Sequence, residues 1–85
     1  MKYWGKIKTE DIMQNNVIAE SKNLAEAVMA ICDSLDLSKP IICDKHRIEI
    51  RDFRRTVFYA DDFIDSVNFD VLEIEIIDPR KKRNN

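Results

Sequence analysis

The sequence predicts a single small α+β domain, made of an N-terminal strand hairpin, one main helix and a C-terminal strand. Three observations favour this class: an apolar stripe at helical spacing over 23–35, alternating apolar and charged residues over 69–77, and a second alternating segment over 2–8. A chain of 85 residues with 45% hydrophobic and 35% charged residues has the composition of one folded domain.

The main helix is expected over residues 23–35. Its apolar positions are spaced by four, three and four residues: Leu24, Val28, Ile31 and Leu35. Asn23 is placed to cap the first turn, and Glu26 to complete a capping box with it. Pro40 is expected to end the helix, because the residue before a proline disfavours the helical conformation.

The first 20 residues are expected to form an antiparallel hairpin, with strands over 2–8 and 12–19. Aromatic and apolar residues that alternate with lysines favour a pleated, half-buried strand in 2–8. The turn falls either at 9–11 or at the asparagine pair 15–16, since asparagine tolerates positive φ. Both turns stay open at this point.

The middle of the chain is the hardest part to place. A short strand is expected over the apolar run 40–43, and the alternation of Ile48, Ile50 and Phe53 suggests another. Residues 57–59 suggest a third short strand, and 61–65 a single helical turn.

The final segment 69–77 is the strongest strand in the sequence, because Leu72, Ile74 and Ile76 alternate with Glu73 and Glu75. One face of this strand is therefore expected to be buried, and the other to meet water or a neighbouring basic strand.

The chain ends in the basic run Arg80–Asn85. We expect the domain to span residues 1–79, and residues 80–85 to form a disordered basic tail.

The order of these elements resembles the β-grasp arrangement of ubiquitin-like domains over residues 2–77. The likeness is clearest where Ala60–Ile64 precedes Phe69–Ile74. It implies a mixed sheet in which the last strand lies beside the first and parallel to it. The chain has no Gly-Gly terminus, so the resemblance implies no conjugation role, and no functional residue is carried over from ubiquitin.

Two further comparisons concern the same segments. The opening Tyr3–Ile7 and the closing Phe69–Ile74 are similar to those of a family of short bacterial proteins of unassigned function. The main alternative to a β-grasp is a two-layer α+β domain with another strand order.

Composition argues against several classes of enzyme. Gly5 is the only glycine, so the chain cannot build the glycine-rich loops that cradle phosphates. Cys32, Cys43 and His46 show no metal-ligand spacing, and the cysteines are expected to be buried free thiols. His46 is expected in an exposed turn, with no nucleophile beside it. We therefore expect no catalytic residue, no metal and no cofactor.

No apolar run approaches the roughly 20 residues that span a bilayer. The N-terminus has no apolar segment of the kind found in signal peptides. A cytoplasmic protein with no membrane partner is the expectation.

Charge is distributed in blocks. Residues 45–55 contain five basic and two acidic residues, whereas 61–78 contain seven acidic residues and no basic one. The basic block is either a phosphate-contacting patch, with Phe53 or Tyr59 stacking on a base, or a structural segment that pairs with the acidic block or forms a solvated loop. The sequence pI of about 5.3 favours the second interpretation.

The acidic block leaves three interpretations open. Asp61 and Asp62 could hold a cation or act in acid–base chemistry, could cap a short helical turn, or could belong to an acidic face that docks a basic partner or mimics nucleic acid. Of these interpretations, helix capping is the simplest, because it requires no further metal ligand, catalytic group or partner.

These observations lead to a non-enzymatic protein-interaction module of unidentified partner. It binds through a charged sheet face or a strand edge, and a second copy of the chain is one candidate partner. The candidate basic surface is Lys6, Lys8, Arg51, Arg54 and Arg55. The candidate acidic surface is Asp61, Asp62 and Asp65. The alternative function is nucleic-acid association through 45–55 and the tail.

Overall fold

The computed structural model describes residues 1–77 and consists of one antiparallel sheet with two helices and a short 3-10 turn. The elements in chain order are β1 (Lys2–Thr9), β2 (Ile12–Glu20), α1 (Leu24–Leu35), α2 (Asp44–Phe53), β3 (Arg55–Tyr59), η1 (Ala60–Asp62) and β4 (Val71–Ile77). The predicted single α+β domain with an N-terminal hairpin and a C-terminal strand is confirmed. The tail at 80–85, and the end of the domain at residue 79, lie outside the described residues.

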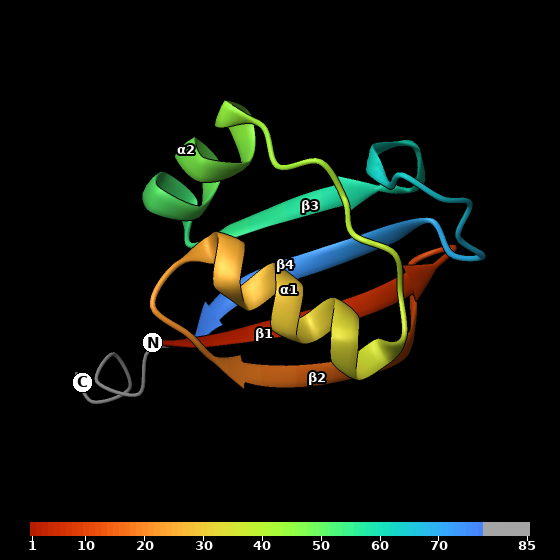
Figure 1. Cartoon of the computed structure of the whole chain (residues 1–85), viewed down its shortest axis with the longest axis horizontal. Helices are drawn as coiled ribbons and strands as arrows, with labels where there is room; N and C mark the ends of the chain where they lie inside the picture. Colours follow the sequence, from red (N-terminus) through yellow and green to blue (C-terminus); the bar gives the residue numbers. More distant parts are fainter. Residues whose placement is uncertain (78–85) are drawn as a thin grey trace.

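The sheet has the strand order β2-β1-β4-β3, and every neighbouring pair is antiparallel (Figure 1). β4 lies beside β1, as expected, but the expectation of a mixed sheet with a parallel pair is wrong. The Asp70 N–H donates to the Lys8 carbonyl at 3.0 Å, so β4 begins beside the hairpin turn and runs back along β1. The short segment after β3 also suits an antiparallel neighbour, since a parallel one needs a long crossover.

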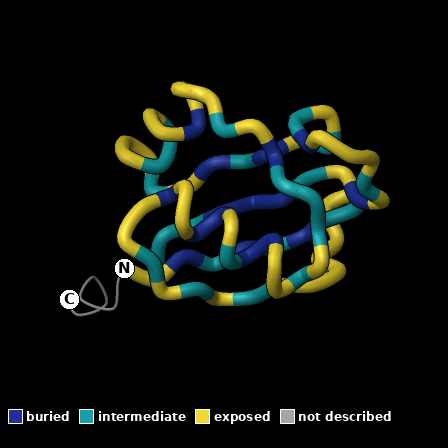
Figure 2. Tube along the Cα trace, in the orientation of Figure 1, coloured by how far each residue is buried: buried dark blue, intermediate teal, exposed yellow. Residues whose placement is uncertain are grey.

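The core lies between the sheet and α1, and the buried stretches follow β1, β4 and β3 but not the edge strand β2 (Figure 2). Alternate residues of β1 face the helix, and Tyr3, Gly5 and Ile7 are buried there. A Cβ on Gly5 would lie 2.6 Å from Cγ2 of Ile31. The only glycine of the chain therefore lets α1 pack closely against β1.

Helix α1 begins as predicted but ends for another reason. The Asn23 side chain accepts the Glu26 N–H at 2.9 Å, whereas the Glu26 carboxylate accepts the Lys22 N–H rather than that of Asn23. The helix ends in Asp36, whose φ of 58° is left-handed. Pro40 comes four residues later and does not stop the helix, so that prediction is wrong.

The hairpin turn is at Glu10 and Asp11, which both have positive φ, at 53° and 66°. This pattern is that of a type I′ turn, whose twist matches the flanking strands. Asn15 and Asn16 instead lie inside β2, where the register shifts by one residue.

The strands expected at 40–43 and 48–53 are absent from the described part of the chain. Residues 44–53 form α2, and Pro40 makes only an isolated bridge to Phe63. The apparent alternation was misleading, because His46 and Ile50 lie one helical turn apart and face inward while Ile48 is exposed. The predicted strands at 57–59 and 69–77 are confirmed as β3 and β4, although β4 begins at Val71. The helical turn expected over 61–65 is confirmed only at 61–62, within η1.

Candidate functional site

The sheet face opposite the helices carries a compact cluster of charges. Glu73 of β4 is only 4% exposed and its carboxylate forms ion pairs with three cations: Lys8 at 2.7 Å, Arg55 at 2.6 Å and Lys6 at 3.9 Å. Lys6 also donates to Glu75 at 2.8 Å. The structure thus brings together three of the predicted basic residues.

These three cations are used within the molecule. Burial raises the pKa of Glu73, but the hydrogen bond from Lys8 and the charges of Lys6 and Arg55 outweigh it, so the pKa lies below its ordinary value. Arg55 therefore pairs with the acidic block, as one of the two sequence interpretations expected. The cluster joins β1, β3 and β4 and leaves little charge for a partner.

The other two predicted basic residues lie elsewhere. Arg51 is in the last turn of α2 and Arg54 caps that helix, with a φ of 63°. Together with Lys22 and Arg47 they line a pocket of about 590 Å³ at the start of α1. The predicted basic surface is therefore two separate sites.

The predicted acidic residues divide in a similar way. Asp61 and Asp65 are exposed, whereas Asp62 accepts the Tyr59 N–H at 2.9 Å and its own carbonyl accepts the Ile41 N–H. Capping is thus the role of Asp62. Over residues 1–77 no group of His, Cys, Asp and Glu side chains is arranged to hold a metal ion.

His46 is wholly buried, so the expected exposed turn is wrong. Its Nδ1 accepts the Cys43 N–H at 2.9 Å, and its ring stacks on Phe58 with centroids 4.1 Å apart. Nε2 lies 3.9 Å from Oδ2 of Asp62 and makes no well-formed hydrogen bond. The sequence signal that could have placed it is its spacing of four from Ile50.

The β3 edge of the sheet is partly covered. The ladder with β4 uses the backbone groups of Thr56 and Phe58, so those of Val57 and Tyr59 point outward. Asp62 of η1 takes the Tyr59 N–H, and α2 packs beside β3 with the His46 ring stacked on Phe58. The helix and the 3-10 turn therefore shield part of this edge, which is one way in which natural sheets protect an edge strand.

The β2 edge is open along the described chain. The Ser21 N–H donates to the Met1 carbonyl, so the backbone groups of Val17 and Ala19 point to β1 and those of Asn16 and Ile18 point outward. The Asn16 N–H meets only the side chain of Asn15, at 2.9 Å. β2 has nine residues, and Ile12–Ala19 contains no charge and no proline.

A groove of about 480 Å³ lies between α2 and the outer side of β3. Phe53 and Tyr59 flank it and are 69% and 55% exposed. Lys45 lies 5.9 Å above the Tyr59 ring, and Arg55 also lines the groove. Glu49 places an acid there too and accepts the Thr56 hydroxyl at 2.6 Å.

Both cysteines are free thiols, but only Cys32 is buried as expected. Burial raises its pKa to about 11, which makes it a poor nucleophile at neutral pH. Cys43 is exposed, because it is the N-cap of α2 and not part of a strand.

No protein-family model matches the chain, and no curated protein or solved structure is significantly similar to it. No helix within residues 1–77 is long and apolar enough to cross a membrane.

Proposed function

We propose that the protein is a non-enzymatic protein-interaction module that binds by strand addition at β2, and that the strand it takes up is β2 of a second copy. The observation that carries the proposal is the contrast between the two sheet edges. Asp62 takes an outward N–H of β3, and α2 packs beside that strand through His46 and Phe58, whereas the outward backbone groups of β2 meet no other strand of the described chain. A long, uncovered edge is a template for another strand.

The chemistry of β2 favours a copy of itself. An antiparallel pair about a two-fold axis at Val17 places the Asn16 backbone opposite that of Ile18. Like charges facing each other destabilise a strand pair, and Ile12–Ala19 contains none. The pairing also covers Ile18, which is 54% exposed.

The test is the oligomeric state of the full chain by sedimentation equilibrium over a range of concentrations. Asn16→Pro removes an outward N–H and leaves the inner ladder intact, so it is expected to give a monomer. Asn16→Ala is the matched control, because it keeps the N–H and is expected to remain dimeric.

Two results would overturn self-pairing: a native protein that stays monomeric at every concentration, or a folded Asn16→Pro variant that still dimerises. If the protein is monomeric but binds a strand of another protein, and Asn16→Pro abolishes that binding, the partner at β2 is that protein and not a second copy.

The groove beside β3 favours a second candidate function, single-stranded nucleic-acid binding. Two exposed aromatic rings beside Lys45 match the stacking and phosphate contacts of such sites. Phe53→Ala with Tyr59→Ala is then expected to weaken oligonucleotide binding, whereas Ile48→Ala on another face of α2 has no effect. Affinity independent of salt would contradict this function.

A further inference from the structure

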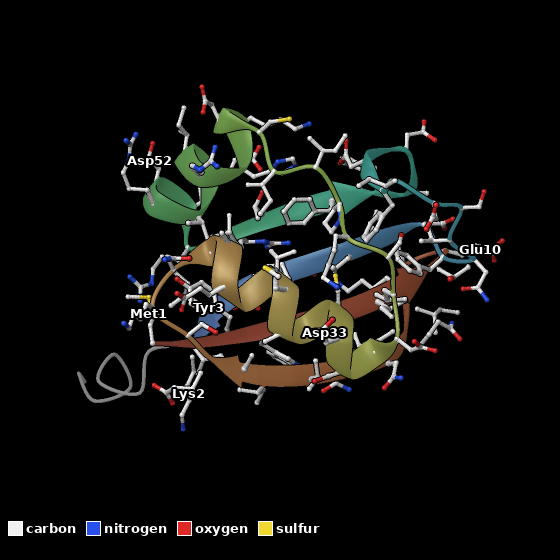
Figure 3. The ribbon with its side chains drawn as sticks, in the orientation of Figure 1. Met1, Lys2, Tyr3, Glu10, Asp33 and Asp52 are labelled. Atoms are coloured by element: carbon white, nitrogen blue, oxygen red, sulfur yellow. The ribbon has the colours of Figure 1, made fainter. Side chains whose placement is uncertain are left out.

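The pocket of about 590 Å³ between α1 and α2 is named the cationic pocket. It is separate from the β2 edge and from the groove beside β3. Its lining residues are Met1, Tyr3, Lys22, Asn23, Leu24, Ala25, Arg47, Ile50, Arg51, Arg54 and Ile76. On α2 they follow helical spacing and occupy a different side from Lys45, Glu49 and Phe53, which line the groove. Figure 3 shows Met1 and Tyr3 at the same end of the molecule as Asp52 of α2.

The charge of the cationic pocket has one sign. Four basic side chains line it, and none of its described lining residues is acidic. Arg47 gives one hydrogen bond to Asp44 and Arg51 gives two to Asp52, and a guanidinium has five N–H donors. Both therefore keep donors for a second anion, which forked guanidinium groups bind bidentately.

The start of α1 adds backbone donors to the same wall. Asn23 takes the Glu26 N–H through its side chain and the Ala27 N–H through its carbonyl. The N–H groups of Leu24 and Ala25 have no partner within the helix, and both residues line the pocket. The positive end of the helix dipole favours an anion at this point.

The remaining wall is apolar. Tyr3 and Leu24 are buried in the core and still contribute to the lining, together with Ile50 and Ile76. The volume of about 590 Å³ lies within the range of about 300–1,000 Å³ typical of small-molecule pockets. A bare inorganic anion would leave the apolar wall without a contact.

We infer that the cationic pocket binds a small phosphate monoester whose phosphate meets the arginines and the α1 amides, and whose apolar or aromatic body rests on Tyr3 and Ile76. This ligand site goes beyond strand pairing at β2 and does not depend on it, because no residue of β2 lines the pocket.

The test is a titration of the full chain, followed by backbone amide NMR, with phenyl phosphate, inorganic phosphate and phenol as three separate probes. Saturable shifts of the Leu24 and Ala25 amides are expected with phenyl phosphate at lower concentrations than with either other probe. Arg47→Gln with Arg51→Gln is expected to weaken phenyl phosphate binding by roughly tenfold or more, because charge-assisted hydrogen bonds are lost.

Lys45→Gln is the matched control, because it removes a positive charge from the other side of the same helix. It is expected to change the affinity less than about twofold. The inference fails if phenyl phosphate gives no saturable shifts, or if Lys45→Gln weakens binding as much as the arginine changes. Equal affinity for inorganic phosphate would also overturn it, because the apolar wall would then contribute nothing. Equal affinity for phenol would do the same, because the basic side chains and α1 amides would then contribute nothing.

Discussion

Oδ2 of Asp62 lies 3.9 Å from Nε2 of the buried His46, and the same oxygen accepts the Tyr59 N–H at 2.9 Å. One carboxylate thus accepts the outward Tyr59 N–H of β3 and faces the buried imidazole of α2. The relationship ties η1 and α2 to the edge strand of the sheet.

The first prediction concerns the pH dependence of His46. Burial lowers its pKa below the ordinary 6.5; Asp62 and Glu49 oppose this and Lys45 adds to it. Between the lowered pKa and 6.5 the unfolded chain binds a proton that the folded chain does not. Stability is therefore expected to fall as pH drops below 6.5, by at most about 1.4 kcal/mol per pH unit.

Urea unfolding between pH 5 and pH 8 measures this slope. His46→Gln is the comparison, because glutamine can still accept the Cys43 N–H but does not titrate in this range. Above the pH range in which carboxylates titrate, the unfolding free energies of the native protein and of the variant should depend differently on pH. If the two dependences are the same, the lowered pKa of His46 is wrong.

The second prediction compares two adjacent acids. Asp62→Ala leaves the Tyr59 N–H without its acceptor and is expected to cost about 1–3 kcal/mol. Asp61→Ala, at an exposed position in the same turn, is expected to change stability by less than about 0.5 kcal/mol. Chemical denaturation measures both, and equal costs would show that Asp62 is not a cap.

The third prediction concerns the charge cluster on the open sheet face. Glu73→Gln removes the carboxylate shared by Lys6, Lys8 and Arg55 and is expected to cost about 1–3 kcal/mol at pH 7, a value reduced for the partial exposure of these cations. Glu75→Gln is the matched control at an exposed carboxylate and is expected to cost less than about 1 kcal/mol.

Glu73 also makes the stability of the fold depend on pH in the acidic range. Its pKa lies below the ordinary 4.5, so its contribution is complete above that pH and is lost as pH falls through the lowered value. The difference in unfolding free energy between the native protein and Glu73→Gln should therefore shrink on acidification. A constant difference down to pH 2 would contradict the lowered pKa.

Strongly periodic segments predicted the fold well. The stripe from Leu24 to Leu35 and the apolar positions Leu72 and Ile74 are buried against the core, and that pattern is local in sequence. The direction of β4 is not local. It depends on contacts such as that of Asp70 with Lys8, and spacing along the chain does not encode them.

The candidate site was predicted only in part. Lys6 and Lys8 come together with Arg55 around Glu73, on the strand face that the alternation expects to meet water or a neighbouring basic strand. Arg51 and Arg54 are expected on the same surface, because 48–53 suggests a strand, whereas these residues belong to the end of α2.

The helical spacing of α2 instead directs Arg51 to the cationic pocket and Phe53 to the groove. A short charged helix with few apolar positions gives a weak periodic signal, and this is why the separation of the two sites was missed.

The last prediction tests the close approach of α1 to β1. Without a clash, Gly5→Ala would be stabilising, because glycine in a strand costs about 0.5–1 kcal/mol relative to alanine. The new Cβ would meet Cγ2 of Ile31 at 2.6 Å, so the substitution is expected to destabilise by about 1–3 kcal/mol. The sign of the change in unfolding free energy thus decides whether the contact is rigid.

Ile31→Leu provides the matched partner, because leucine keeps the volume of the side chain and lacks the methyl group that the new Cβ would meet. Alone it is expected to cost less than about 1.5 kcal/mol. The double variant Gly5→Ala with Ile31→Leu should be more stable than the sum of the two single changes, since the two residues share one contact. Additive costs would place the destabilisation elsewhere, and a stabilising Gly5→Ala would mean that α1 moves away from β1 at little cost.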